Sequence, residues 1–424
     1  MFVPITEYPS IVKDAETYLR PAFASKNRLD NCMRYLTGLI VLPTRKNILS
    51  ISRSFVDSKD QSSVNNFITD SCWDEKAFHD AGIGMVQDAV KKHGITRGVL
   101  VVDDSFSEKE GKHIEGVGNY WDHSQNKYIL AHNIISTYYV TREFSVVLDF
   151  AIYRKKEDCD DKNKFRTKVE IARELISRAV SYGLPITRVV FDSWYATREL
   201  VEHIEALGIK EWVTQAKSDR VVLSDDGRTE TNLADYARTI PKEKFRPVKI
   251  YTSLLGKKKT YWVYCTTVRM KFLNGRKVRL VISYDNQQLE GDPLFFITNV
   301  RFWEEKKILQ AYATRWSIEG FHRDAKQNLG LGEYQVRKIQ GVRRHIAMVS
   351  FAYNLLQLGS GFGSIMDNLK GNLRTIGSRC RLAGVQVLHS LISFVMKMAQ
   401  QRKDIGSETI LAMLTGPLSK SKGY

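Results

Sequence analysis

Four side chains in the segment 309–326 combine a phenol, a guanidinium, a carboxylate and an ammonium at helical spacing. In order they are Tyr312, Arg315, Glu319 and Lys326. No Gly or Pro precedes Gly320 in this segment, which is therefore predicted to form one amphipathic helix. At 3.6 residues per turn, the spacings bring all four side chains to one helix face. That face could bind a phosphodiester beside a metal ion, and a solvated, ion-paired surface face is the alternative.

Two further carboxylates stand far upstream, each at the end of a short apolar run. Asp103 follows GVLVV, and Asp192 follows RVVF. Open α/β sheets expose ligand-binding groups at the ends of such strands, so both acids could converge with Glu319. Three neighbouring carboxylates repel one another unless cations lie between them. For either Asp alone, capping of the following turn is the competing interpretation.

Carboxylate ligands without a Cys or His cluster favour Mg²⁺ or Mn²⁺ over zinc. Two such ions about 3.5–4 Å apart can activate a water or a 3′-hydroxyl and stabilise the leaving oxygen of an in-line phosphoryl displacement. The first acid is ambiguous, because Asp103 and Asp104 are adjacent and successive strand residues face opposite sides. Only one of these two side chains is expected to reach the metal ions.

The charge balance of the 424-residue chain indicates a polyanionic partner. Lys and Arg number 64 against 47 Asp and Glu, which gives a formal net charge of +17. Neutralising phosphates releases condensed counterions and supplies most of the non-specific affinity for nucleic acid. An anionic membrane surface is the competing partner, but the sequence has no lipid-anchor motif and no long basic amphipathic helix.

Other features favour a soluble protein in a reducing, intracellular compartment. The five cysteines are scattered without a C-x-x-C pair, which argues against disulfides and a structural zinc site. The N-terminal MFVPITEYPS lacks the basic and apolar regions of a signal peptide. The longest apolar stretches, such as VLHSLISFVM from Val387, are shorter than a bilayer span requires.

The N-terminal segment, residues 1–95, is predicted to be a helical domain. Its apolar positions follow the helical period, and Gly94 is a candidate C-cap. A DNA-end-binding module is one interpretation of its basic residues, and a packing domain is the other. Those basic residues are Arg28, Arg34, Arg45, Lys46 and Arg53.

Residues 96–216 are predicted to form a mixed sheet with helices on its faces, because β-branched runs alternate with amphipathic segments. The short connector 141–143 predicts a hairpin. Residues 217–300 alternate as strands around turns such as Asn274–Gly275, which predicts a β-rich insertion. Residues 301–360 return to helices that carry the four spaced side chains, and 361–424 form a helical C-terminal region. The expected fold class is therefore α/β with helical N-terminal and C-terminal regions.

The chain resembles DDE-type transposases of bacterial insertion sequences, in the group with a Y-x2-R-x3-E-x6-K signature. The four spaced side chains match that signature at every position. VVDDSFSEKEGKHIEGVG from Val101 resembles the first-acid segment, and FDSWY from Phe191 resembles the second-acid strand. The resemblance covers roughly residues 97–360. It implies an RNase H-like catalytic core with a β-rich insertion between Asp192 and Glu319.

The resemblance implies a role for each matching residue. Asp103, Asp192 and Glu319 would hold two Mg²⁺ or Mn²⁺ ions per active site. Arg315 and Lys326 would bind phosphates near the transposon end, and Tyr312 would hydrogen-bond a phosphate. Asp103 is preferred over Asp104, because the second position of the first-acid segment varies between acids in the family.

Further side chains are weaker candidates for contacts with DNA. Trp194 or Trp303 could stack a base flipped from the duplex, although most tryptophans are core residues. His322 could contact DNA or assist proton transfer, and a plain surface role or a hydrogen-bonded role is the alternative. The run Lys257–Lys259 is predicted to form a basic hairpin tip that either follows a DNA backbone or is a solvated turn.

The predicted function is DNA transposition. The protein would bind double-stranded terminal inverted repeats, cleave the transposon ends and join the 3′-hydroxyl ends to target DNA. The resemblance also implies a homodimer on paired ends and a location in the bacterial cytoplasm with the nucleoid, without a membrane partner. The rivals are a non-catalytic, domesticated or regulatory DNA-binding descendant, and an RNase H-like nuclease that cuts without joining strands.

Overall fold

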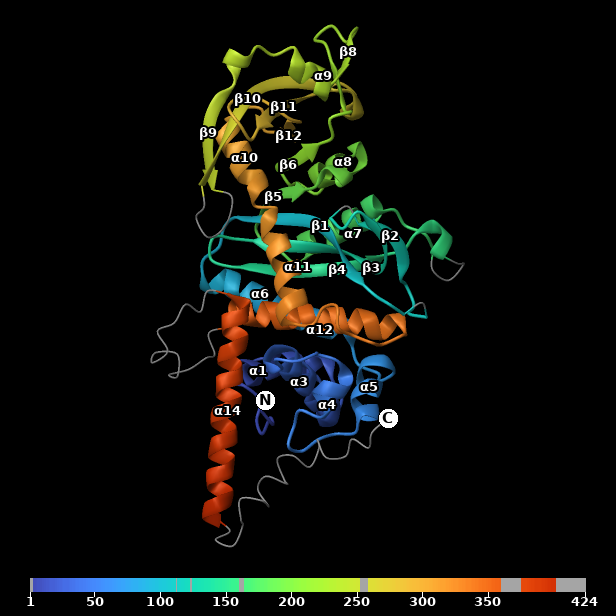
Figure 1. Ribbon diagram of the computed structural model, residues 1–424, viewed down its shortest axis with the longest axis vertical. Coiled ribbons are helices and arrows are strands. Elements are labelled where there is room, and N and C mark those ends of the chain that lie inside the picture. Colours follow the sequence, from blue (N-terminus) through green and yellow to red (C-terminus); the bar gives the residue numbers. More distant parts are fainter. Residues whose placement is uncertain are drawn as a thin grey trace. The chain divides into compact units, whose positions relative to one another are not determined.

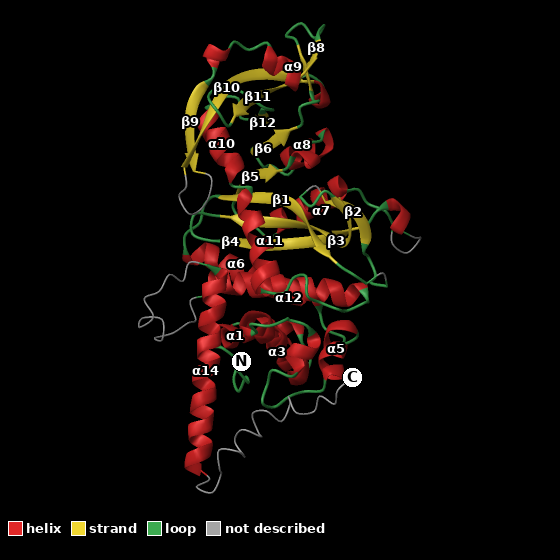
Figure 2. Cartoon of the chain, viewed as in Figure 1, coloured by secondary structure: helices red, strands yellow, loops and turns green. Residues whose placement is uncertain are grey.

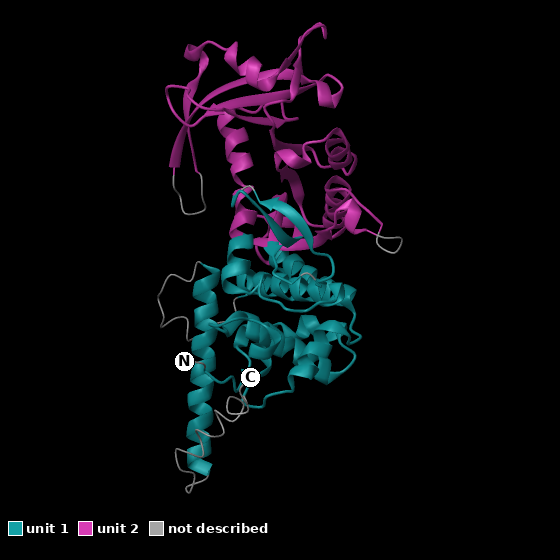
Figure 3. Cartoon of the chain, turned by 45° about the vertical axis from the view of Figure 1, so that its right-hand side comes forward, with its two compact units in different colours: residues 1–91, 107–132, 321–424 teal, residues 92–106, 133–320 magenta. Residues whose placement is uncertain are grey.

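The computed structural model describes residues 3–111, 113–122, 124–159, 164–251, 258–359 and 375–401. The chain divides into two compact units (Figure 3). Unit 1 comprises residues 1–91, 107–132 and 321–424, and unit 2 comprises residues 92–106 and 133–320. Each unit combines segments that are distant in the sequence. The predicted division into five consecutive segments remains a prediction.

Unit 1 is mainly helical, as the sequence predicts for both terminal regions. Buried apolar side chains of α3, including Leu36 and Leu39, belong to a core that α12 supplies with Val349 and Ala352. In the described part of unit 1, the helices are α1 (Ser10–Asp14), α2 (Glu16–Leu19), η1 (Arg20–Ala22), α3 (Lys26–Val41), α4 (Ile48–Ser52), α5 (Gln61–Thr69), α6 (Glu75–Lys92), α12 (Ile339–Leu358) and α14 (Ile376–Gln401) (Figure 1). The helix α11 (Trp316–Asn328) continues from unit 2 into unit 1.

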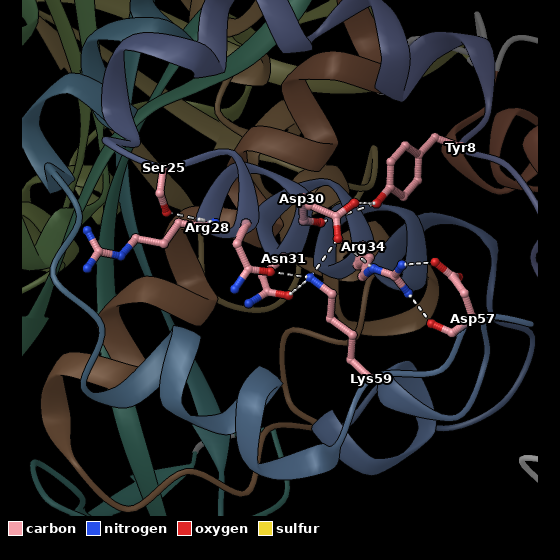
Figure 4. A network of polar contacts seen from close by, with 9 residues as sticks. Tyr8, Ser25, Arg28, Asp30, Asn31, Arg34, Asp57 and Lys59 are labelled. Carbon is pink, nitrogen blue, oxygen red and sulfur yellow. Dashed lines mark hydrogen bonds and ion pairs between the residues drawn. The ribbon is translucent and has the colours of Figure 1, made fainter.

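A polar network centred on Asp30 ties α3 to the neighbouring loops (Figure 4). The Asp30 carboxylate accepts hydrogen bonds from the Tyr8 hydroxyl, from Arg34 Nε at 2.9 Å and from Lys59, whose Nζ lies 2.6 Å away. Arg34 also pairs with Asp57. Because the Arg34 side chain is buried and satisfied within unit 1, its charge stabilises the fold and is not available to DNA.

A second network in unit 1 holds the segment that follows α11. The Nε2–H of His345 donates to the Gly330 carbonyl at 3.0 Å, and its Nδ1 accepts from the Tyr35 hydroxyl at 2.8 Å. Lys109 Nζ donates to the Gly332 carbonyl at 2.7 Å. Gly330 has a φ of +72°, a conformation that favours glycine. Buried polar side chains therefore fix the chain direction directly after the signature segment.

The strands form one twelve-stranded mixed sheet, in the order β2-β3-β1-β5-β6-β12-β11-β10-β7-β8, with β4 beside β3 and β9 beside β10 (Figure 2). The predicted hairpin of β3 and β4 is confirmed. The strands are β1 (Gly98–Glu108), β2 (Gly118–Asp122), β3 (Lys127–Val140), β4 (Ser145–Tyr153), β5 (Ile186–Phe191), β6 (Glu211–Ala216), β7 (Val221–Leu223), β8 (Glu230–Asn232), β9 (Arg246–Tyr251), β10 (Lys258–Met270), β11 (Arg276–Tyr284) and β12 (Leu294–Thr298).

Parallel pairing is found in the middle of the sheet, where α7 precedes β5 and α8 connects β5 to β6. The strands β1, β5 and β6 are parallel neighbours, whereas the strands after β6 pair antiparallel. The β-rich insertion is not a detached sheet, because its last strand, β12, pairs with β6 and extends the parent sheet. The mixed α/β fold class is confirmed. In unit 2 the connecting helices are α7 (Lys168–Ser181), α8 (Arg198–Ala206), α9 (Leu233–Arg238) and α10 (Glu305–Ala313), with the short turns η2 (Lys156–Asp158), η3 (Ser193–Tyr195), η4 (Lys242–Lys244) and η5 (Lys271–Leu273).

The last described helix, α14, corrects one expectation about membranes. Its 26 residues are long and apolar enough to cross a bilayer by length and composition, whereas the stretch from Val387 alone is too short. A single such helix is weak support for a membrane span, since core helices pass the same test. Within unit 1, α14 packs on α3 and α12, and Leu382, Ala383 and Val387 are buried.

Candidate active site

The pairing of β1 with β5 brings the two upstream acids together. The strands are parallel, and Val102 is directly paired with Phe191. Asp103 and Asp192 each follow one member of that pair, so they lie at the point where the pairing of the two strands ends. Asp192 directly follows β5, whereas β1 continues to Glu108, so the expectation that Asp103 ends its strand is wrong. Parallel strands expose their carboxyl ends at one edge of the sheet, which is where open α/β sheets bind ligands.

Asp103 and Asp104 point to different surroundings, as strand alternation requires. The Asp103 carboxylate accepts from Arg315 Nη1 at 2.5 Å through Oδ2 and from the Asp104 amide at 3.0 Å through Oδ1. The Asp104 carboxylate accepts from Lys168 Nζ at 2.8 Å and from the Tyr195 hydroxyl at 3.0 Å. Both oxygens of Asp104 therefore have structural partners, and Asp103 is the acid that faces Arg315.

Arg315 bridges the first and third candidate acids. Its Nη2 donates to Glu319 Oε1 at 2.6 Å, in addition to the contact between Nη1 and Asp103. Its Nε is buried without a hydrogen-bond acceptor among the described residues. Glu319 is about half exposed, while the Arg315 side chain is 16% exposed. The guanidinium thus occupies the space between two carboxylates that the sequence assigns to metal ions.

Asp192 also caps the turn that follows it. Its Oδ1 accepts a hydrogen bond from the Ser193 amide at 2.6 Å, so Asp192 caps the following turn, as the competing interpretation predicts. A cap and a ligand are compatible, because a carboxylate has two oxygens. The backbone carbonyl of Asp192 accepts from the Thr214 hydroxyl on β6 at 3.3 Å. These contacts hold the second acid at the end of β5.

The electrostatics show that all three acids act on the same guanidinium. Burial alone would lower the pKa of Arg315, but the influence of Tyr312, Asp103, Glu319 and Asp192 raises it. Burial raises the pKa of Asp103 to about 7, while Arg315 opposes that rise and Asp104 and Asp192 add to it. Like charges are therefore concentrated at this part of the sheet, where Arg315 pairs with Asp103 and Glu319 and Lys168 pairs with Asp104.

The predicted single helix through the signature is wrong. The structure has two helices, α10 ending at Ala313 and α11 beginning at Trp316. Between them the backbone bonds shorten to the i→i−3 pattern, for example from the Arg315 amide to the Tyr312 carbonyl at 2.8 Å. A helical wheel across this break does not describe which residues share a face. Arg315 is at the break, with Tyr312 before it and Glu319 after it.

Tyr312 is buried at the end of α10. Its hydroxyl donates to Gln215 Oε1 on β6 at 3.1 Å, and its ring packs on Phe296 at a centroid distance of 4.8 Å. Burial, the first cause, raises the pKa of Tyr312. In this arrangement the phenol anchors α10 to the sheet, and the predicted phosphate contact of Tyr312 stays a prediction.

The remaining candidates fall into buried and exposed groups. His322 is buried and packs against Phe321 within unit 1, so the plain surface alternative is wrong for it, and its predicted contact with DNA stays a prediction. Lys326, on the same helix, is exposed. Trp303 is buried in the core of unit 2, with Arg188 and Lys307 over its ring at 4.4 and 4.5 Å, so it is not a platform for a base.

Trp194 is different, because its side chain is 55% exposed in the turn directly after Asp192. Lys168 Nζ and Lys217 Nζ lie 5.3 and 5.0 Å from its ring centroid. Lys168 also pairs with Asp104, which links this exposed indole to the first-acid strand. An aromatic face beside two ammonium groups can stack a base and bind a phosphate.

Two of the basic candidates in the N-terminal region are structural. Lys46 is buried and donates from Nζ to the Leu39 carbonyl at 2.5 Å, and Arg34 is buried in the Asp30 network. Arg45 and Arg53 are exposed. Lys258 and Lys259 are exposed on β10, and Lys257 lies outside the described residues. The sequence pattern did not separate the buried lysines and arginines from the exposed ones, because burial depends on packing.

The sequence interpretation missed the partners that orient the acids. Lys168 and Tyr195 donate hydrogen bonds to the Asp104 carboxylate, and Gln215 accepts one from the Tyr312 hydroxyl. A signal for Tyr195 existed, since it lies within the FDSWY segment that resembles the second-acid strand. No local pattern identifies Lys168 or Gln215, because each meets its partner only through the sheet topology.

The donor set fits a divalent cation in chemistry, although it is not assembled around one. Two carboxylates, those of Asp103 and Glu319, pair with a single positive group, and Asp192 lies beside Asp103 at the end of β5. Carboxylate oxygens are the ligands that Mg²⁺ and Mn²⁺ prefer. Across the described ranges, no group of three or more His, Cys, Asp or Glu side chains is spaced to hold a metal ion as it stands. Arg315 must therefore move, or the acids must close in, before two ions can be held.

Comparison with known proteins identifies the family. The chain belongs to the DDE superfamily endonucleases, whose family model matches residues 18–259, more than half of the chain. The match includes Asp103 and Asp192, while Glu319 lies beyond it. The resemblance expected from the sequence is thereby confirmed.

Two individual proteins show similarity to parts of the chain. The chain is 26% identical over 163 residues to a probable transposase for insertion sequence element IS701 from Microchaete diplosiphon. That alignment covers 38% of this chain and 42% of the relative, so it spans less than half of either protein. The NurA nuclease from Sulfolobus solfataricus aligns over 74% of this chain and 93% of its own, at 10% identity and a TM-score of 0.25, which is too low to support an argument.

Proposed function

We propose that the protein is a DNA transposase that cleaves transposon ends and joins the 3′-hydroxyls to target DNA. The family membership supports endonuclease chemistry, and the IS701 relative supports transposition. The observation that carries the proposal is the meeting of Asp103 and Glu319 at the Arg315 guanidinium, with Asp192 placed beside Asp103 by the register of β1 and β5. Carboxylates from three separate elements gather there only through the tertiary fold.

In the proposed reaction each side chain has a defined role. Asp103, Asp192 and Glu319 would hold two Mg²⁺ or Mn²⁺ ions, which supply an activated nucleophilic oxygen and stabilise the leaving oxygen when bound. Arg315 and the exposed Lys326 would bind phosphates of the transposon end, the former through its planar fork and the latter as a point charge. Lys168 and Tyr195 would keep Asp104 away from the reacting groups.

The proposed partner is double-stranded DNA, namely terminal inverted repeats and a target. The net charge of +17 supports binding that weakens strongly as salt rises. A homodimer on paired ends and a nucleoid-associated, cytoplasmic location complete the proposal. Both follow from the family resemblance.

Cleavage and strand transfer of a labelled transposon-end duplex test the proposal. Wild type, Asp192→Ala and Glu319→Gln are compared with Mg²⁺ and with EDTA. We expect wild type with Mg²⁺ to cut and to join ends to a target plasmid, and both variants to bind the duplex without cutting. Equal behaviour of all three proteins would show that the acids are structural and would favour the non-catalytic DNA-binding rival. Cutting without joining would favour the nuclease rival.

A further inference from the structure

The contact of Arg315 with two carboxylates is not the arrangement that a phosphate-binding arginine needs. Its two Nη atoms are each bonded to a different acid, Asp103 at 2.5 Å and Glu319 at 2.6 Å. A guanidinium binds a phosphate best when both parallel N–H groups meet the same anion. In the structure, therefore, the fork of Arg315 is already occupied by the side chains proposed to bind metal.

We propose that Arg315 is an exchangeable counter-ion. Before a metal binds, its guanidinium holds Asp103 and Glu319 together. A divalent cation then displaces it from the same carboxylate oxygens, and the released guanidinium becomes available to a DNA phosphate. This inference rests on the proposed function, because it requires these acids to be metal ligands.

Charge is the first physical reason for the exchange. Asp103 and Glu319 share the one positive charge of Arg315, and the strand register places the third acid, Asp192, beside Asp103. Carboxylates brought together without a cation repel one another, and a single guanidinium compensates them only in part. A divalent ion brings twice the charge in a smaller volume, and so it competes for the same oxygens.

The hydrogen bonding of Arg315 is the second reason. Its Nε is buried and has no acceptor among the described residues, although the side chain is only 16% exposed. A buried donor without a partner destabilises its position. The paired position of Arg315 is therefore well fixed by two charge-assisted bonds and yet incompletely satisfied, which suits a group that must later leave.

The exchange makes metal binding and phosphate binding interdependent. While Arg315 pairs with the acids, it lowers the affinity of the site for a metal and cannot bind DNA. Once a metal has taken the carboxylates, Arg315 contributes to DNA affinity instead. Metal binding and phosphate binding both require the contact of Arg315 with the acids to break, so each should favour the other. Such a coupling usually changes an affinity by about 5- to 150-fold.

Titration of Mn²⁺ into the DNA-free, full-length protein tests the proposal, with free Mn²⁺ measured by electron paramagnetic resonance at one fixed pH. The proteins are wild type, Arg315→Gln and Arg188→Gln. Arg188 is a matched control, because it also pairs with an acid, Glu211, at 2.7 Å and its side chain is 18% exposed. We expect Arg315→Gln to bind Mn²⁺ about 5- to 150-fold more tightly than wild type and Arg188→Gln to bind like wild type.

Equal or weaker Mn²⁺ binding by Arg315→Gln would overturn the exchange, while the proposed function would stand if Glu319→Gln still lost Mn²⁺. If neither wild type nor Arg315→Gln binds Mn²⁺ without DNA, the exchange fails, and the cleavage assay with Mg²⁺ decides the proposed function separately. If Arg315→Gln does not fold, a crystal structure of wild type with Mn²⁺ tests the exchange instead. Crystals of wild type soaked in Mn²⁺ should show Arg315 detached from Asp103, and a retained contact beside a bound ion would overturn the exchange.

Discussion

Val102 and Phe191 are direct partners in the parallel pairing of β1 with β5. This one register decides the geometry of the candidate active site, because the next residue on each strand is an acid. A shift by one residue would turn Asp104 toward Asp192 and Asp103 toward Lys168, since successive side chains face opposite sides. The two adjacent acids of β1 therefore have roles that mutagenesis can separate.

Asp103→Asn and Asp104→Asn are expected to have different effects. Asp103→Asn removes a proposed metal ligand. The transition state of cleavage then loses several kcal/mol of stabilisation, which lowers the cleavage rate by about a thousandfold. Asp104→Asn loses the charge partner of Lys168 and lowers the free energy of unfolding by roughly 1–3 kcal/mol, with cleavage retained below its melting temperature. End-cleavage assays and urea denaturation of both variants provide the measurements. The opposite assignment would follow if Asp104→Asn stayed fully stable and inactive.

Tyr312→Phe is expected to lower stability more than DNA affinity. It removes the donor to Gln215 Oε1, and loss of a hydrogen bond to this half-buried acceptor costs about 0.5–1.5 kcal/mol. Adding Gln215→Leu should restore part of that loss, because the second change removes the unpaired partner. Urea denaturation of the two single variants and the double variant measures the coupling. A Tyr312→Phe protein with unchanged stability and weaker end binding would support the phosphate contact implied by the family resemblance.

Trp194→Ala and Trp303→Ala distinguish an exposed tryptophan from a buried one. Trp194 is 55% exposed, so its removal should change the free energy of unfolding by less than about 0.5 kcal/mol. Loss of a stacking surface should weaken binding of single-stranded DNA by about 1–3 kcal/mol. Trp303→Ala should instead cost about 3–5 kcal/mol of stability. Fluorescence anisotropy and urea denaturation provide the two readouts, and unchanged single-strand affinity of Trp194→Ala would remove this residue from the DNA-binding set.

The buried His345 should make the protein less stable as the pH falls. Burial, the largest cause, lowers the pKa of His345 from 6.5 to about 3. An unfolded chain therefore takes up a proton below pH 6.5 that the folded chain does not. Each pH unit below 6.5 should lower the free energy of unfolding by about 1.4 kcal/mol, until the pH nears the folded pKa.

His345→Gln is the matched variant, because an amide can bond to Gly330 or Tyr35 without titrating. Urea denaturation of both proteins is measured from about pH 7 to about pH 5, a range that includes the unfolded pKa of about 6.5. The free energies of unfolding of the two proteins should diverge as the pH falls. The variant should lose less stability than wild type over this range. Parallel curves would show that His345 is protonated in the folded protein.

Much of the fold could be predicted from local patterns. The β-branched runs that end in Asp103 and Asp192 are strands, the connector at 141–143 closes a hairpin, and both terminal regions are helical where described. These features depend on periodicity and on short-range turns, which the sequence carries directly. The family resemblance rests on the same local residues, and the match over residues 18–259 confirms it.

Three features were decided only by the tertiary structure. The break between Tyr312 and Glu319 has no Gly or Pro to mark it, and α10 is instead anchored to the sheet through Gln215. The burial of Arg34 and Lys46 depends on acceptors distant in the sequence or on backbone carbonyls. The pairing of Arg315 with Asp103 joins residues 212 positions apart.

The sequence by itself determined which acids, bases and aromatic side chains this protein has, and which strands lead to the first two acids. The tertiary structure decided which of those side chains meet, because the strand register selects Asp103 over Asp104 and the helix break turns Arg315 toward the acids. Side-chain partners across a sheet depend on long-range packing, and no local period in the chain encodes them.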